Sequence, residues 1–560
     1  MPSLEILGGA LTAALLGYAV HRTVLQPHES LAKNAEWLAA LLLLVPALPA
    51  AVLRAQIGST LLASLVAYSA YYCSILLATI AYRLSSTHPL TIYPGPLLCK
   101  VTKLWMVYTA NTGKLHEYTR QLHATYGPIV RIGPNELSVV DVDLLSRILG
   151  SEGMPKGPLW EGRRISGKRG AGAKNNRGNL IGNRYKDRHA EARKTWNRAF
   201  TPAAMKDYEP ILARRAAQLI DELKQKGATG SVDLSLWLSY CIFDFMGDMV
   251  FGGGFELMHD GDRDGIYRTM VAGLHLPALT QQIPWVAPVL PYLPWVGKHM
   301  KALGQFAFKC VTKRLQEGSV TNDLFYHLLD EVPNPEKQTP FPVIMTNAVT
   351  AMLAGSDTTA VALCNTFYCV LAHPDVYQHL REEVDVAFPP GAGDPVDAAK
   401  LSSLEYLNAV INESLRLYPS IPTSLQRAPQ PGTGTHQISP TLVIDERTSI
   451  LVPPYVLHRD SRYFSPDPDR FWPERWLRKD DPDVVTNTSA FVPFSSGPPN
   501  CVGRPVALLS MRMILAWMVR SFEMRLVEGY DVKQWERDLR DYFALQKGPL
   551  PVVLRSRGNM

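Results

Sequence analysis

A ten-residue loop near the C-terminus constrains this chain more than any other stretch. Residues 494–503 read Phe-Ser-Ser-Gly-Pro-Pro-Asn-Cys-Val-Gly and directly precede a helical stretch over residues 504–522. A thiolate at a helix N-terminus is stabilised by the unpaired backbone N–H groups and by the helix dipole. Gly497 and Gly503 would let the backbone pass close to a flat cofactor, where a Cβ would collide. The loop predicts that Cys501 donates its sulfur to a metal, although a lone cysteine is more often buried and inert.

The bulk composition excludes several classes of protein. Of 560 residues, 46% are hydrophobic and 19% charged, so the chain is long and apolar enough to bury a large core. Seven scattered cysteines without CxxC spacing argue against a disulfide framework and predict a reducing compartment for the catalytic part. The net charge of +6 is modest and indicates no nucleic-acid partner.

Three apolar runs, over residues 4–20, 37–53 and 57–82, occupy the N-terminus. A membrane-spanning helix needs roughly 20 apolar residues. The third run is long enough, whereas the first two are near the lower limit and prolines interrupt the second. A cleaved signal peptide and buried core helices are the alternatives, and Glu5 opposes the first of them. Residues 1–84 are therefore predicted to anchor the chain in a lipid bilayer through one to three transmembrane helices.

A proline- and glycine-rich hinge over residues 85–100 follows the anchor. Pro94-Gly95-Pro96 predicts a stiff extended connector, because proline fixes its own φ and pushes the preceding residue out of the helical region. Arg83, Lys100 and Lys103 place the domain over residues 101–560 on the cytoplasmic side.

Hydrophobic periodicity predicts a mainly α fold with small β-sheets (α+β). A β-hairpin is expected from residues 129–133 and 137–140, and short strands near 441–444 and 450–452. Between them helical periodicity dominates, with amphipathic helices predicted over residues 203–226, 232–251, 344–372 and 404–418.

The spacing Phe, two residues, Gly, three residues, Cys, one residue, Gly resembles the haem-binding signature of the cytochrome P-450 family. The resemblance implies haem b (iron protoporphyrin IX) ligated by Cys501, with Phe494, Gly497 and Gly503 shaping the cofactor site. The family usually carries Arg or His two residues before the cysteine, in contact with a haem propionate. This chain has Pro499 there, so propionate neutralisation is expected from His189, Arg193 and Arg427.

His189 and Arg193 share one helix face, being four residues apart, and the segment His-Ala-Glu-Ala-Arg resembles the family's propionate-binding helix. Twelve Lys and Arg residues lie between positions 163 and 198. They form either a solvated basic face or a docking surface for an acidic redox partner, and both interpretations remain open.

Residues 354–359, Ala-Gly-Ser-Asp-Thr-Thr, interrupt an apolar helix with poor helix formers. They indicate either a functional break or an ordinary kink with a local threonine–backbone hydrogen bond. The motif resembles the family's acid–alcohol pair, which makes Asp357 and Thr358 the expected proton-delivering residues. By resemblance, the substrate is expected to contact Met352, Leu353, Ala354, Ile421, Thr423 and Phe543.

Glu413 and Arg416 stand three residues apart on one helix, and Arg475 lies downstream in an aromatic setting. As an exposed pair they would signify little. The resemblance implies a buried Glu-Arg-Arg cluster that supports the loop below the haem.

Together the motifs predict a cytochrome P-450 fold preceded by N-terminal transmembrane helices, similar to membrane-bound fungal members. The implied activity is a haem-thiolate monooxygenase that uses O2 and NADPH-derived electrons. The chain has no GxGxxG motif after a strand, so NADPH–cytochrome P-450 reductase is the expected partner. We expect an endoplasmic reticulum membrane location, a catalytic domain facing the cytosol, and a lipophilic small-molecule substrate of secondary metabolism, with a terpenoid favoured. The apolar stretch 283–295 is either a packed loop or a bilayer contact that admits such a substrate.

Two other functions are compatible with the loop. A haem-thiolate isomerase or dehydratase would need no reductase, and a non-enzymatic haem sensor or lipid-binding membrane protein would need no proton delivery. The presence of both Asp357 and Thr358 favours the oxygenase.

Overall fold

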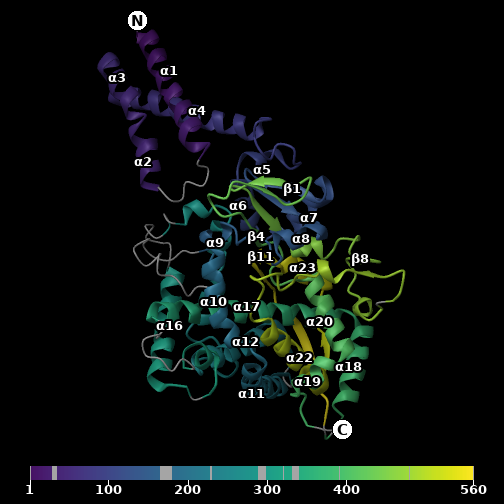
Figure 1. Cartoon of the computed structure of the whole chain (residues 1–560). Helices are drawn as coiled ribbons and strands as arrows, with labels where there is room; N and C mark the ends of the chain where they lie inside the picture. The colour runs from purple at the N-terminus through teal and green to yellow at the C-terminus, as the bar shows by residue number, and fades with distance from the viewer. Residues whose placement is uncertain are drawn as a thin grey trace.

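The computed structural model describes residues 2–27, 35–163, 180–227, 230–287, 290, 298–319, 321–330, 340–389, 391, 393–478 and 480–558. The N-terminal helices project from one end of the molecule, and the C-terminus lies at the opposite end (Figure 1). A small β-rich region lies between these helices and a large helical body. The prediction of a mainly α fold with small sheets is confirmed.

The N-terminal segment forms a compact set of apolar helices. It comprises α1 (Pro2–Val20), η1 (His21–Leu25), α2 (Ala35–Leu44), α3 (Ala47–Ile57) and α4 (Thr60–Leu84). Small residues let these helices approach closely: a Cβ on Gly17 would lie 2.6 Å from the Tyr71 carbonyl oxygen, and Ala63 and Ala67 are fully buried.

Three stretches of this segment, Leu4–Leu25, Trp37–Ile57 and Thr60–Leu84, are long and apolar enough to cross a membrane. A fourth such helix, α12 (Leu234–Phe251), has 83% of its span buried inside the protein and belongs to the core of the helical body.

The connector after α4 is extended only near Pro96 and is folded before it. Residues 85–93 form turns, and α5 (Leu97–Val101) begins four residues beyond them. Leu90 and Tyr93 are buried in the apolar cluster that also contains Leu137 and Val139, which explains why the segment folds back. The Arg131 N–H donates to the Pro94 carbonyl at 2.7 Å, so the connector is fixed to the domain that follows it.

A four-stranded sheet joins distant parts of the chain in the order β1 (Ile129–Gly133), β2 (Glu136–Val139), β7 (Ser449–Val452) and β4 (Leu425–Arg427). The predicted hairpin is confirmed, since β1 and β2 are antiparallel. Strand β7 lies parallel to β2 and antiparallel to β4, with Arg427 opposite Ile450. This sheet fixes Arg427 relative to the N-terminal half of the domain.

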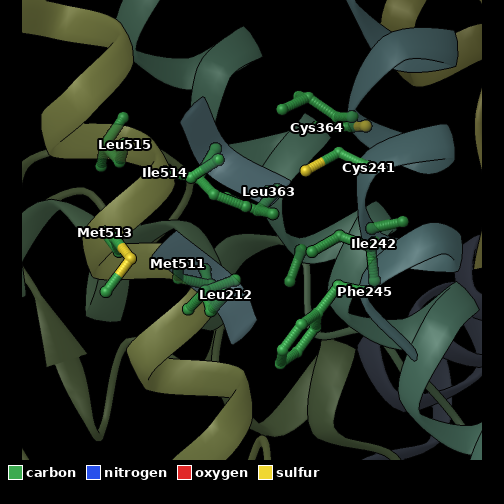
Figure 2. Packing of buried hydrophobic residues seen from close by; sticks show 14 of the residues in the cluster. Leu212, Cys241, Ile242, Phe245, Leu363, Cys364, Met511, Met513, Ile514 and Leu515 are labelled. Carbon is green, nitrogen blue, oxygen red and sulfur yellow. The ribbon is translucent and has the colours of Figure 1, made fainter. Parts of the chain in front are cut away.

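The core of the helical body is built from α11 (Pro202–Gly227), α12, α17 (Phe341–Ala372) and α22 (Arg504–Ser521). These helices confirm the predicted ranges to within a few residues. Figure 2 shows side chains of all four elements meeting, among them Leu212, Phe245, Leu363 and Met513. Burying each such side chain stabilises the fold by about 1.5–3 kcal/mol. The helix that follows the Cys501 loop is thereby packed against the helix that carries Asp357 and Thr358.

The remaining helices are α6 (Leu104–Asn111), α7 (Leu115–Tyr126), α8 (Val142–Ile148), α9 (Leu159–Gly162), α10 (Lys186–Arg198), α13 (Leu257–Asp260), α14 (Ile266–Ala272), α15 (His275–Thr280), η4 (Pro284–Val286), α16 (Lys298–Glu317), η6 (Tyr326–Asp330), α18 (Pro374–Ala387), α19 (Ala398–Ser403), α20 (Glu405–Leu417), α21 (Pro454–Leu457), η8 (Pro473–Trp476), η9 (Thr488–Ala490) and α23 (Val532–Asp538). The remaining strands are β3 (Ser231–Asp233), β5 (Thr435–Gln437), β6 (Val443–Asp445), β8 (Phe464–Ser465), β9 (Val485–Thr486), β10 (Phe522–Leu526), β11 (Arg540–Tyr542), β12 (Ala544–Gln546) and β13 (Pro551–Ser556). They form a sheet in the order β10-β13-β3 and the pairs β11-β12, β5-β6 and β8-β9.

Candidate functional site

Cys501 lies near the end of its loop, three residues before α22 begins at Arg504. The Cys501 N–H donates to the Phe494 carbonyl at 2.9 Å, which closes the loop. Cys501 is accessible to solvent. Protein atoms nevertheless lie close around its thiol, and the resulting desolvation raises the pKa of the thiol. Backbone N–H groups of Gly503 and Arg504, together with the Arg193 guanidinium, act in the opposite direction and lower the pKa. An accessible sulfur with N–H groups aimed at it suits a metal-ligating thiolate.

The two glycines of the loop differ in what they make possible. Gly497 has φ +70°, and a Cβ there would lie 2.1 Å from the Leu149 carbonyl oxygen. The close approach of the Leu149 backbone therefore already requires glycine at position 497, independently of any cofactor. Gly503 lies beside the sulfur, where a Cβ would come 3.9 Å from Cys501 Sγ. The Arg504 guanidinium lies over the Phe494 ring, 5.8 Å from the ring centroid.

A group of basic side chains lies next to this loop. Arg427 is 2% exposed, its Nε has no hydrogen-bond partner, and it forms no ion pair within the described part of the chain. Desolvation lowers the pKa of Arg427 to about 10. His189 is also buried, and desolvation followed by the charges of Lys156, Arg193 and Arg427 lowers its pKa to about 3. A buried cation without a carboxylate partner is costly, so this arrangement fits a bound group that carries carboxylates, as the haem propionates do.

Arg193, on α10, contacts the Cys501 loop directly. Its Nη1 donates to the Asn500 carbonyl at 2.6 Å and to the Pro498 carbonyl at 3.3 Å, and its Nη2 donates to Asn500 Oδ1 at 2.7 Å. The guanidinium therefore holds the loop on both sides of Pro499. A role toward a propionate remains a prediction for this residue.

The Asp357–Thr358 motif lies on α17, which is continuous across it rather than broken. Hydroxyl groups satisfy backbone carbonyls within the helix: Thr358 Oγ1 donates to the Ala354 carbonyl at 2.6 Å, and Ser356 Oγ to the Met352 carbonyl at 2.7 Å. The local threonine hydrogen bond is therefore present, and the functional role of the motif remains a prediction.

Asp357 and Thr358 point to different surroundings. Asp357 is 7% exposed, and its Oδ2 accepts a hydrogen bond from Gln546 Nε2 at 2.9 Å. Thr358 is partly exposed, and no hydrogen bond joins it to Asp357 among the described residues. Desolvation raises the pKa of the Asp357 carboxyl, and the Lys547 ammonium and the Gln546 hydrogen bond partly oppose that rise.

The structure brings Glu413, Arg416 and Arg475 together in a fully buried cluster. Arg416 donates to both Glu413 oxygens at 2.8 and 2.9 Å, and Arg475 Nε donates to Oε1 at 2.9 Å. The guanidinium of Arg416 also binds the carbonyls of His458, Pro468 and Arg470, so the cluster fixes the segment that leads to the Cys501 loop.

The predicted substrate-lining residues have mixed surroundings. Met352 is buried, whereas Leu353, Ala354 and Ile421 are partly exposed. These assignments remain predictions.

Two of them contact residues that the sequence analysis missed. Thr423 is buried and donates its hydroxyl to Asp541 Oδ2 at 2.7 Å, and desolvation raises the pKa of Asp541 to about 7. Phe543 has the unusual φ of 84° and lies 3.7 Å from the Arg163 guanidinium. Asp541, Gln546 and Arg163 stand in no motif, so only their contacts identify them.

Two surface predictions fall partly outside the described residues. Residues 164–179 of the basic segment are not described, and neither are residues 288–289 and 291–295 of the apolar stretch. Within that stretch, Trp285 is 60% exposed.

Comparisons with known proteins agree with this geometry. The family model of cytochrome P450 matches residues 93–552. Cytochrome P450 monooxygenase FCK2 of Fusarium pseudograminearum is 32% identical over 488 residues, which cover 86% of this chain and 85% of that protein. Cytochrome P450 67 of Uromyces fabae is 31% identical, covering 83% of this chain and 86% of that protein. Tryprostatin B 6-hydroxylase of Aspergillus fumigatus is 28% identical, covering 87% and 84%.

Proposed function

Because this chain belongs to the cytochrome P450 family, we propose that it is a haem-thiolate monooxygenase that hydroxylates a lipophilic small molecule. The observation that carries the proposal is the accessible Cys501 sulfur, with backbone N–H groups aimed at it from the start of α22. The names of the relatives support the reaction type, since two of those cited are a monooxygenase and a hydroxylase.

Bound haem would supply the iron at which dioxygen is reduced. Cys501 would hold that iron and donate electron density, as a thiolate ligand does. Arg427 is placed to neutralise a carboxylate of the cofactor, because it is a buried cation, and His189 beside it would offer a hydrogen bond from a neutral ring. Thr358 is partly exposed on α17, and Asp357 is the nearby acid, so this pair would hold and deliver protons.

The electrons, the membrane and the substrate complete the proposal. We expect electrons from NADPH through NADPH–cytochrome P450 reductase, which is a membrane protein in the same bilayer. The three apolar stretches of the N-terminal segment support a membrane anchor, and Arg83 at the end of α4 supports a cytosolic catalytic domain at the endoplasmic reticulum. Apolar residues at Met352, Leu353 and Ile421 favour a terpenoid or another apolar secondary metabolite.

The ligand assignment is tested by the difference spectrum of the reduced, carbon monoxide-treated full-length protein. We expect the band typical of a thiolate-ligated haem for the wild type, and its loss in Cys501→Ser. Cys310→Ser is the matched control, because Cys310 is half-buried on α16 and should keep the band. A band typical of histidine-ligated haem in the wild type would contradict the assignment. NADPH-dependent oxygen consumption with added reductase then separates the monooxygenase from an isomerase.

A further inference from the structure

The hairpin formed by β11 and β12 contacts the Asp357–Thr358 motif in two ways. Gln546, the last residue of β12, donates from Nε2 to Asp357 Oδ2 at 2.9 Å. The Leu545 N–H donates to the Ser420 carbonyl at 2.9 Å, and Ser420 Oγ donates to the Thr358 carbonyl at 2.8 Å. Strand β12 therefore binds the Asp357 side chain directly and the Thr358 backbone through Ser420.

The hairpin itself is firmly held. Asp541 accepts the Thr423 hydroxyl at 2.7 Å, and the Asp541 N–H donates to the Gly113 carbonyl at 2.7 Å. The Tyr542 ring packs against His275 of α15, with centroids 4.8 Å apart. Contacts to three separate parts of the chain leave Gln546 little freedom, and a side chain fixed in this way can position a neighbour.

The charges around Asp357 come from several elements. The Lys547 ammonium, directly after β12, is the nearby cation, and it also faces Cys364 of α17, Asp233 of β3 and Tyr267 of α14. A carboxylate favours its charged form when it accepts a hydrogen bond or lies near a cation. Both Gln546 and Lys547 therefore oppose the effect of burial on Asp357.

We infer that Gln546 is a positioning residue for proton delivery, which fixes the orientation of the Asp357 carboxyl through its hydrogen bond of 2.9 Å. This inference rests on the proposed function, because it assigns a task to the acid of that reaction. The neutral amide of Gln546 can donate a hydrogen bond without competing for the transferred proton.

The first test measures the carboxyl group itself. In full-length holoprotein, the infrared C=O band that disappears in Asp357→Asn is titrated against pH. Gln546→Leu should move the midpoint to higher pH, because the Asp357 carboxylate loses a hydrogen bond that favours its charged form. Gln534→Leu is the matched control, because Gln534 makes the same kind of bond to Asp538 at 2.8 Å on α23. An unchanged midpoint in Gln546→Leu would overturn the inference.

The second test distinguishes a positioning role from a structural one. With added reductase, the solvent deuterium isotope effect on NADPH-driven oxygen consumption should rise at least twofold in Gln546→Leu and stay at the wild-type value in Gln534→Leu. A shifted midpoint with an unchanged isotope effect would show that the contact is structural only. If the wild-type protein consumes no oxygen, the proposed function fails and this role fails with it, whereas an unchanged midpoint contradicts the inference alone.

Discussion

Pro499 stands in the Cys501 loop where the family resemblance leads us to expect a basic residue, and Arg193 binds the loop on both sides of it. Its guanidinium reaches the loop from α10 and binds the carbonyls of Pro498 and Asn500. Arg193 also lowers the pKa of the Cys501 thiol through its charge. A single side chain therefore affects both the shape of the loop and the electrostatics of the sulfur.

Replacing Arg193 should weaken haem retention. In Arg193→Gln the loop loses its charged donor, and we expect the ratio of haem to protein after purification to fall severalfold. The ratio is measured by the absorbance of extracted haem against the protein concentration. Lys194→Gln is the control, because Lys194 is exposed on the same helix. Equal haem content in wild type and Arg193→Gln would contradict this role.

At the scale of the element, the ends of α20 and η8 are joined by one buried carboxylate. Glu413 accepts from Arg416, Arg475, the Trp472 N–H and Trp476 Nε1, at distances between 2.8 and 3.0 Å. Two guanidinium groups then bind the carbonyls of the segment before the Cys501 loop. The cluster supports the site without contacting it.

Removing the charge of Glu413 should destabilise the domain. Glu413→Gln leaves two buried guanidinium groups without their anion, and breaking a buried pair costs roughly 3–5 kcal/mol. The free energy of unfolding is measured by denaturant titration of the detergent-solubilised full-length protein. Glu405→Gln, exposed in the first turn of the same helix, should change it by at most about 1 kcal/mol. Equal losses in the two variants would mean that the cluster contributes no more than a surface charge.

At the scale of the whole molecule, the catalytic domain is attached to its N-terminal helices by short, specific contacts. Arg131 Nη1 donates to the Arg83 carbonyl at 3.1 Å, and Arg83 Nη1 donates to the Val101 carbonyl at 2.6 Å. The turns of residues 85–93, fixed by the buried side chains of Leu90 and Tyr93, replace a free linker between α4 and the domain (Figure 1).

The packing of α1 and α3 against α4 predicts that all three apolar stretches span the bilayer. An odd number of spans places the N-terminus in the lumen when the catalytic domain faces the cytosol. An N-terminal extension carrying an Asn-x-Thr acceptor should therefore be glycosylated, whereas the same extension at the C-terminus should not. Glycosidase-sensitive shifts on gels give the result. An unmodified N-terminal extension would indicate two spans or an inverted domain.

The sequence by itself determined the features whose information is local. The Cys501 loop, the acid–alcohol motif and the helices of the core are each encoded within one segment, by residue spacing or by 3.6-residue periodicity. The confirmed hairpin of β1 and β2 also belongs here, because a two-residue turn joins its strands.

Only the tertiary structure decided which distant residues meet. Gln546 binds Asp357 across 189 residues, and Asp541 binds Thr423 across 118. The hinge predicted as an extended connector is extended at Pro96 but forms turns over residues 85–93, where burial of Leu90 and Tyr93 folds the chain back. Periodicity specifies which face of an element is buried, but the partner of that face depends on how all elements pack, and no local pattern records it.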